Sequence, residues 1–237
     1  MLAKFVEKIT SLREIKTFEI NGDTYATEHL HRVIPHVDRP NCIRVSGLNS
    51  ICKLIREELD IMASTLFIEV DDYETVNVFT SLLDDLSRDK LYTAKADVPG
   101  FAGGFREAEK MLIQLRSLFI PNDDTAYLLD LLSRINMESG VKSMDNGVTQ
   151  TVTAKKGVSL NETVQLKPRV KLQPFRSFLE VAQPESEFLL RVRDDGQIGL
   201  FEADGGVWKL EAKRNIAAYF EHEPKDLVDT KRVIVMY

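Results

Sequence analysis

The fold class is decided by three runs, Thr65-Leu-Phe-Ile-Glu-Val70, Thr75-Val-Asn-Val-Phe-Thr80 and Lys90-Leu-Tyr-Thr-Ala-Lys95. Apolar and polar residues alternate in these runs, which is typical of strands that bury one face. The acidic pairs Asp71-Asp72 and Asp84-Asp85 separate the runs. Short polar links of this kind join antiparallel neighbours. We therefore predict an antiparallel meander near residues 65–96.

Helical periodicity flanks this meander on both sides. Apolar residues recur at three and four in five segments, which predicts helices at residues 1–12, Ser46–Met62, Phe105–Phe119, Thr125–Glu138 and Arg214–His222. Pro121-Asn-Asp-Asp124 is expected to supply the N-cap of the fourth helix. The glycine pair Gly103-Gly104 is expected to end the preceding sheet.

Strand periodicity returns near both ends of the chain. Asn21-Gly22 between two short runs is the strongest local hairpin signal, so Phe18–Tyr25 is predicted to form a hairpin. Ser139–Gly147 is predicted to be a mobile loop, and strands are expected to follow at Thr149–Lys155, Thr163–Gln173, Glu187–Arg193, Gln197–Glu202, Val207–Ala212 and Arg232–Met236. Because strands come in consecutive runs, the predicted class is α+β, with antiparallel sheets packed against helices, and not a dinucleotide-binding sheet.

The domain organisation is less constrained by the sequence. With 237 residues the chain fits one large domain or two small ones. We expect an N-terminal α/β segment at 1–62, a β-meander with two helices at 63–140, and antiparallel strands with one helix at 141–237. A single compact domain is the alternative.

Composition limits the functional classes. The chain is 43% apolar and carries a formal net charge of −6, which favours solubility but leaves room for a local basic face. No run approaches the roughly 20 apolar residues of a membrane span, and charges interrupt the apolar residues of the N-terminus, so no signal peptide is expected. Cys42 and Cys52 fit no standard zinc spacing, and we expect both to be reduced, partly buried thiols in a cytoplasm.

A basic strand is the first candidate binding site. Lys167, Arg169 and Lys171 alternate with apolar residues, so all three point to one face of a strand. Arg191 and Arg193 repeat the pattern, and together these cations could bind the phosphates of a nucleotide or of a nucleic-acid strand. The alternative is a solvated outer face on which the cations pair with Glu202 and Glu211 across the sheet.

A glycine-rich turn is the second candidate. Asp204-Gly-Gly206 permits close approach of a ligand to the backbone, and Trp208 could stack on a base beside Lys209. The alternative is an ordinary hairpin turn with Trp208 half buried.

Histidines, cysteines and paired aspartates give weaker signals. His29, His31, His36 and Asp38 could surround a metal, and Cys42 with a nearby histidine could act as a nucleophile. The aspartate pairs at 71/72, 84/85, 123/124 and 194/195 all fall in predicted turns or caps, where aspartate forms local hydrogen bonds. We therefore expect no catalytic residue, no metal and no cofactor.

Several longer stretches carry a family resemblance, namely 145–157, Leu172-Gln-Pro-Phe-Arg-Ser-Phe-Leu-Glu180 on to Pro184, Glu187–Arg191 and Phe201–Lys209, together with the meander at 68–94 and the Phe105–Phe119 helix. Over roughly residues 60–220 the chain resembles a family of phage and prophage early proteins of unknown function. The resemblance implies a host-cell cytoplasmic location and no catalytic assignment.

Two functional hypotheses follow from the resemblance and the basic strand. The first is a non-enzymatic counter-defence protein, a homo-oligomer, that sequesters an anionic nucleotide signal or inhibits a host protein. Its ligand would be held by Lys167, Arg169, Lys171, Arg176, Arg191, Arg193 and Lys209, with Trp208 or Phe175 for stacking. A buried ion pair between Arg176 and Glu180 would instead make Pro174–Glu180 part of the scaffold. The second is an accessory of phage DNA recombination or replication. It would use the same basic β-strand to bind single-stranded DNA or the proteins that act with that DNA. An enzyme built from His29, His31, Asp38 and Cys42 is a third reading.

Overall fold

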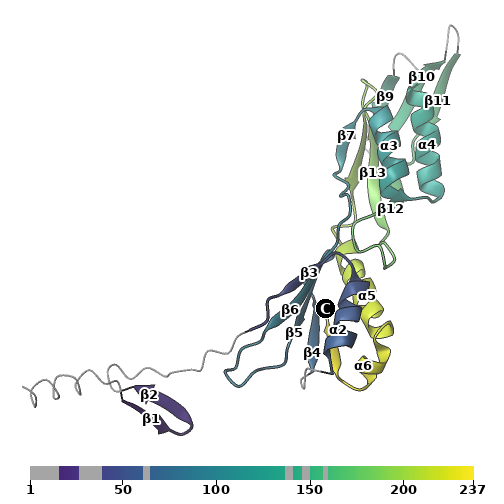
Figure 1. Cartoon of the computed structure of the whole chain (residues 1–237). Helices are drawn as coiled ribbons and strands as arrows, with labels where there is room; N and C mark the ends of the chain where they lie inside the picture. Colours follow the sequence, from purple (N-terminus) through teal and green to yellow (C-terminus); the bar gives the residue numbers. More distant parts are fainter. Residues whose placement is uncertain (1–15, 27–38, 61–64, 137–140, 146–149, 157–159) are drawn as a thin grey trace, which may run out of the picture. The chain divides into compact units, whose positions relative to one another are not determined.

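The computed structural model describes residues 16–26, 39–60, 65–136, 141–145, 150–156 and 160–237 (Figure 1). The chain packs as two units, Met1–Pro40 and Asn41–Tyr237. This boundary differs from the one expected after residue 62, and the three-segment division stays a prediction. The helix expected at residues 1–12 lies outside the described residues.

The first unit contains the expected hairpin, formed by β1 (Thr17–Ile20) and β2 (Asp23–Ala26). Asn21 and Gly22 form its two-residue loop with φ of 55° and 81°. Positive φ at both loop positions matches the right-handed twist of the strands, which explains why Asn-Gly predicts this turn. The rings of Phe18 and Tyr25 stack across the pair at 6.1 Å.

The second unit contains a first five-stranded sheet, in the order β15-β4-β5-β6-β3. The antiparallel meander of β4 (Leu66–Val70), β5 (Thr75–Phe79) and β6 (Lys90–Lys95) confirms the prediction for residues 65–96. The edge strands β3 (Ile43–Val45) and β15 (Val233–Met236) are parallel to their neighbours, so this sheet is mixed.

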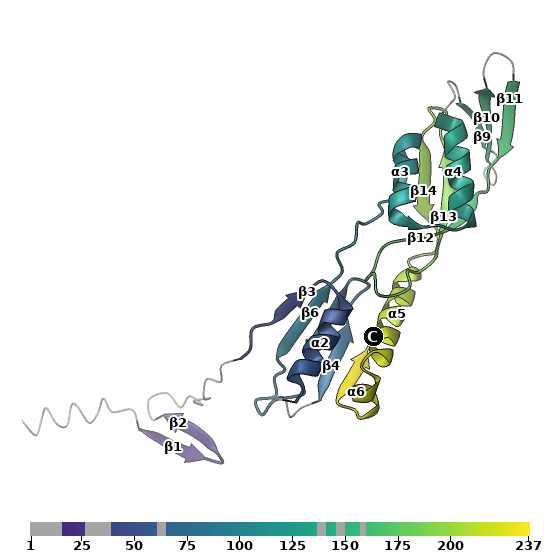
Figure 2. The ribbon, with the colours of Figure 1, turned by 45° about the vertical axis from the view of Figure 1, so that its right-hand side comes forward.

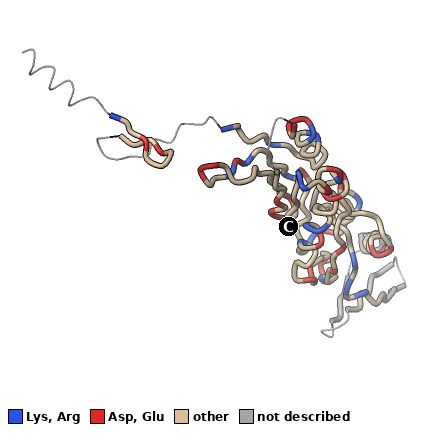
Figure 3. Tube along the Cα trace, turned by 90° about the horizontal axis from the view of Figure 1, so that it is seen from below, with Lys and Arg blue, Asp and Glu red and all other residues tan. Residues whose placement is uncertain are grey.

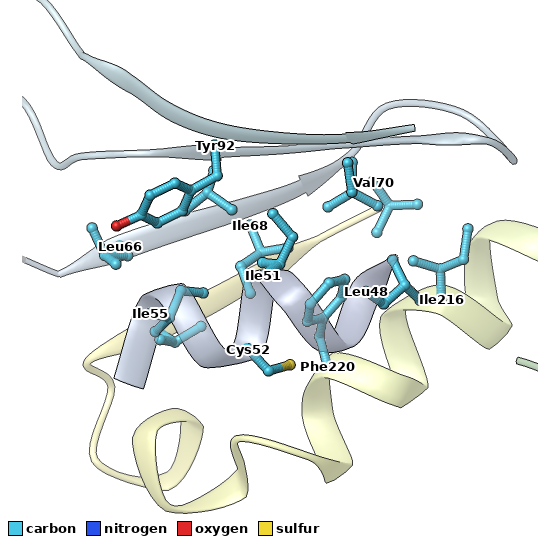
Figure 4. Close-up of a cluster of buried hydrophobic side chains, with 14 of the residues drawn as sticks. Leu48, Ile51, Cys52, Ile55, Leu66, Ile68, Val70, Tyr92, Ile216 and Phe220 are labelled. Atoms are coloured by element: carbon cyan, nitrogen blue, oxygen red, sulfur yellow. The ribbon is translucent and has the colours of Figure 1, made fainter. Parts of the chain in front are cut away.

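Three helices accompany the first sheet: α2 (Leu48–Glu58), α5 (Trp208–His222) and α6 (Lys225–Asp229). Figure 4 shows Leu48, Ile51 and Ile55 of α2 packed between the strands and α5. They are fully buried in one hydrophobic cluster with Ile68 and Phe220. Apolar residues at three and four along α2 form this buried stripe.

A second five-stranded sheet is entirely antiparallel, in the order β7-β14-β13-β12-β8. Its strands are β7 (Gly104–Arg106), β8 (Phe119–Ile120), β12 (Arg169–Pro174), β13 (Ser186–Val192) and β14 (Ile198–Glu202). The helices α3 (Ala108–Leu118) and α4 (Asp123–Asn136) lie side by side over one of its faces (Figure 2). Met111, Leu128 and Leu132 of these helices meet Phe188 and Leu200 in a second hydrophobic cluster.

A third, three-stranded antiparallel sheet consists of β9 (Val141–Asp145), β10 (Gln150–Lys156) and β11 (Leu160–Gln165). The buried Gln150 side chain links it to β13, because it accepts from Val192 N at 2.9 Å and also donates to the Val192 carbonyl. Residues 141–145 were expected within a mobile loop, and they form a strand instead.

The connection between β12 and β13 leaves the second core and enters the first. Phe178 is 1% exposed and belongs to the cluster around Ile68 and Phe220. Ser177 Oγ donates to the Tyr73 carbonyl at 2.6 Å, and Asn49 N donates to Glu180 Oε1 at 3.5 Å. The segment from Arg176 to Gln183 is therefore structural, and it joins the two cores.

The α+β class is confirmed, but several element predictions are wrong. Val207–Ala212 is the start of α5 and not a strand, so Asp204-Gly-Gly206 leads into a helix. Phe105 lies in β7 and not in a helix, because Gly104, with φ of 117°, continues the sheet instead of ending it. The single strand expected at 163–173 divides into β11 and β12, which belong to different sheets.

No helix within the described ranges is long and apolar enough to cross a membrane.

Candidate functional site: the outer face of the second sheet

The second sheet has two chemically different faces. Even-numbered residues of β12 and β13, such as Val170 and Phe188, are buried under α3 and α4. Odd-numbered residues point to the opposite side, which we call the outer face. Its side chains are exposed or half buried: Phe105, Arg169, Lys171, Glu187, Leu189, Arg191, Arg193 and Phe201.

Two aromatic rings form the centre of the outer face. Phe105 and Phe201 meet edge to face, with ring centres 5.2 Å apart. Both rings lie over Gly199, where a Cβ would be 2.6 Å from Phe201 Cε2 and 2.9 Å from Phe105 Cε1. A side chain at Gly199 would therefore force the rings off the sheet. The absence of a side chain at Gly199 allows the two rings to lie over it, and we call this ring pair the aromatic platform.

Arginine is stacked on this platform. The guanidinium carbon of Arg193 is 3.7 Å from the ring centre of Phe105. A stacked guanidinium keeps its N–H donors in its own plane, where they can bind a phosphate or a base edge. The neighbouring Arg191 lies opposite Gly199 in the β13–β14 ladder, and it donates to the Leu190 carbonyl at 3.1 Å.

The predicted basic strand supplies the remaining cations of the outer face. Arg169 pairs with Glu187 at 2.9 Å, and Lys171 pairs with Glu185 at 3.2 Å. The expected partners Glu202 and Glu211 were wrong, because Glu202, opposite the buried Phe188, pairs with Arg176 instead, and Glu211 lies in α5. Exposed ion pairs of this kind contribute about 0–1 kcal/mol, so a phosphate can replace either carboxylate at small cost.

Lys167 lies beside this face and not on it. Its ammonium group pairs with Asp124 Oδ1 at 3.1 Å and sits 4.9 Å from the ring centre of Tyr127. Asp124 Oδ2 also accepts from Lys171 N at 2.7 Å, and Asn122 donates to the Lys171 carbonyl at 3.0 Å. The start of α4 thus covers the open edge of β12.

The other three predicted residues gather in a separate cluster. Arg176 is 6% exposed, and its guanidinium carbon lies 4.2 Å from the ring centre of Trp208. It pairs with Glu202 at 3.1 Å, and Trp208 Nε1 donates to the same carboxylate at 3.3 Å. Burial lowers the pKa of Arg176, and the carboxylate of Glu202 opposes that shift.

This cluster is structural, because Arg176 and Trp208 are buried against each other and their polar groups contact the Glu202 carboxylate. Tyr73 meets the Trp208 ring edge-on at 4.7 Å, and the exposed Lys209 places its ammonium nitrogen 5.7 Å from both ring centres. Arg176 was expected to contact a ligand or to pair with Glu180. It instead joins α5 to the end of β14, and Glu180 lies at the first turn of α2.

The candidate metal and catalytic groups do not come together in the described residues. His29, His31, His36 and Asp38 lie outside them. The described histidines, cysteines and carboxylates contain no group of three that could hold a metal. Cys42 is exposed and Cys52 is buried, both as free thiols, which corrects the expectation that both are partly buried.

Three of the four aspartate pairs have local roles, as expected, whereas Asp124 of the pair at 123/124 bonds to the distant Lys167 and Lys171. Asp72 Oδ1 accepts from Glu74 N at 2.8 Å, Asp85 from Ser87 N at 3.0 Å and Asp195 from Gln197 N at 3.0 Å. These are turns in which the side chain replaces a backbone acceptor.

Sequence reasoning missed the contact between Phe105 and Phe201 and named Trp208 and Phe175 as stacking candidates instead. Phe201 could have been found from Ile198-Gly-Leu-Phe201, where glycine and phenylalanine share a face at period two. Phe105 could not, because its partner strand β14 lies far along the chain.

Figure 3 shows Lys and Arg interspersed with Asp and Glu along the described trace. The outer face is therefore distinguished from the rest of the described trace by the stack of Arg193 on Phe105 and not by a lack of acidic residues nearby.

The chain matches no protein-family model, and comparisons with curated proteins and with solved structures find none that matches it. The resemblance to phage early proteins stays a prediction.

Proposed function

We propose that the chain is a non-catalytic binding protein and that it holds single-stranded nucleic acid on the outer face of the second sheet. The observation that carries this proposal is the stack of Arg193 on Phe105, beside Phe201 and over Gly199. Aromatic rings flanked by cations are the arrangement that binds unpaired bases and their phosphates without sequence preference.

The layout of the outer face favours an extended ligand. Its cations and rings run from β12 to β7, across three inter-strand steps of about 4.8 Å each, or roughly 14 Å. That span is longer than one nucleotide, so the outer face can contact several nucleotides of an extended strand. A strand of several nucleotides can stack bases on Phe201 and on the guanidinium plane of Arg193 and place phosphates at Arg169, Lys171 and Arg191.

A compact nucleotide is the second candidate, supported by the Arg193–Phe105 stack alone. One base stacked on the guanidinium plane of Arg193 and one phosphate at Arg191 would satisfy it. In a phage, a protein that binds single-stranded nucleic acid would act as an accessory of DNA recombination or replication. A protein that captures a nucleotide would act in counter-defence by sequestering it.

Fluorescence anisotropy with labelled oligothymidine of about 15 nucleotides tests the proposal. We expect Phe201→Ala to weaken binding by about 1–3 kcal/mol, or roughly 5- to 150-fold, because one stacked base is lost. Affinity should fall steeply with salt, since phosphate contacts release counterions. Nucleotide capture would instead hold at moderate salt and would not need a long oligonucleotide.

Arg116→Ala is the matched control, because Arg116 is an exposed cation on α3, on the helix-covered side of the sheet. It should leave the dissociation constant unchanged, whereas Arg193→Ala should raise it. Equal losses in both variants, or no binding by the unaltered protein at low salt, would contradict the proposal.

A further inference from the structure

The edge strand β15 differs from the other edges of the two five-stranded sheets. β3 and β7 have three residues each and β8 has two, and β3 and β7 each contain an arginine. β15 is Val233-Ile-Val-Met236, which is longer, uncharged and rich in β-branched residues. Ile234 is 38% exposed and Met236 41% exposed, beside the outward-facing Phe67 of β4. Uncharged apolar edges of this kind invite pairing with a further strand.

The hydrogen-bonding pattern leaves half of the β15 backbone available. β15 runs parallel to β4, and Leu66 N donates to the Arg232 carbonyl at 2.9 Å. A parallel ladder uses the groups of alternate residues, so Ile234 and Met236 bond to β4. The N–H and C=O groups of Val233 and Val235 therefore point away from the sheet.

We propose that β15 pairs antiparallel with β15 of a second copy of this chain, about a two-fold axis at Val235. The two Val235 residues then exchange their outward N–H and C=O groups. Ile234 lies opposite Met236 of the second copy, and Val233 opposite Tyr237. In this register even-numbered residues lie opposite even-numbered residues and odd opposite odd. The core-facing sides of the two sheets therefore fall on the same side of the joined sheet.

Charge supports the same partner. Lys231 lies just before β15, whereas the acidic residues Glu69, Asp71 and Asp72 lie at the far end of the adjacent β4. The two-fold axis brings Lys231 of the second copy toward that acidic end, about two inter-strand steps or roughly 10 Å away. This is slightly more than the Debye length of about 8 Å at physiological salt, so the attraction is partly screened there and stronger at low salt, and it is repeated by symmetry.

Sedimentation equilibrium of the full chain from about 1 to about 100 µM tests this inference. We expect a dimer that Val235→Pro weakens at least tenfold, because proline removes the outward N–H without removing a bond to β4. Val235→Ala is the matched control, since it trims the side chain but keeps the N–H, and it should dimerise. Circular dichroism and the urea midpoint check that each variant folds.

A second variant guards against misfolding of the proline form. Ile234→Lys places a charge on the exposed side of the edge and should also give a monomer, whereas Ile113→Lys, at a 56% exposed site on α3, should not. A monomer at all concentrations would overturn the inference, as would a dimer insensitive to both β15 changes. Nucleic-acid binding is measured separately, so failure here leaves the proposed function standing.

Discussion

Phe178 provides the sharpest test of the packing. In the sequence it falls between β12 and β13 of the second sheet, but its side chain is buried in the core of the first sheet. Its side chain is 1% exposed among residues that include Ile68 and Phe220. A buried phenylalanine removes about 150–250 Å² from water. At roughly 25 cal/mol per Å² the ring contributes several kcal/mol, and Phe→Ala changes in cores cost about 3–5 kcal/mol.

We therefore expect Phe178→Ala to lower the free energy of unfolding by about 4 kcal/mol, measured by urea denaturation followed by circular dichroism. The adjacent Leu179 is 68% exposed and supplies the control, since Leu179→Ala should change stability by less than about 0.5 kcal/mol. A loss below about 1.5 kcal/mol for Phe178→Ala, or equal losses at both sites, would refute the account of the β12–β13 connection.

Three further results are expected. Asn122→Ala should cost about 1–2 kcal/mol in urea denaturation, because its side chain accepts from Thr125 N at 2.8 Å and caps α4, whereas Asp123→Ala should cost little. Iodoacetamide at pH 8 should modify the exposed Cys42 but spare Cys52, since burial raises the pKa of the Cys52 thiol to about 11; rapid labelling of both thiols in the folded protein would be contrary. Arg56 holds the pKa of Asp226 below its usual value, so the folded state favours the carboxylate. The stability gained in this way is present above the ordinary aspartate pKa and is lost as pH falls below it. Asp226→Asn should therefore match the stability of the unaltered protein in acid and be less stable at neutral pH.

Local signals account for much of the fold. The Asn21-Gly22 turn, the alternation in β4, β5 and β6 and the asparagine before α4 each act within a few residues, so sequence spacing was enough. The errors arose where tertiary contacts decide. Residues 207–212 carry apolar residues that suit either period, and the burial of Trp208 and Ala212, four residues apart, selects a helix.

The candidate site was only partly predictable for the same reason. Period two predicted that Arg169 and Lys171 share one face of their strand and that Arg191 and Arg193 share one face of theirs. The β12–β13 ladder shows that both pairs lie on the same face of the sheet. It could not show that Arg176 is buried against Trp208, because that contact joins residues from different elements. The aromatic centre depends on the pairing of β7 with β14, which no local pattern encodes.

Photocrosslinking tests the central claim most directly. Oligodeoxynucleotides that carry iodouracil would be irradiated with the unaltered protein, and the crosslinked peptides identified by mass spectrometry. We predict crosslinks at Phe105 and Phe201, which lie together on the outer face of the second sheet. Crosslinks confined to α3 and α4, or none under conditions where the oligonucleotide binds, would contradict it.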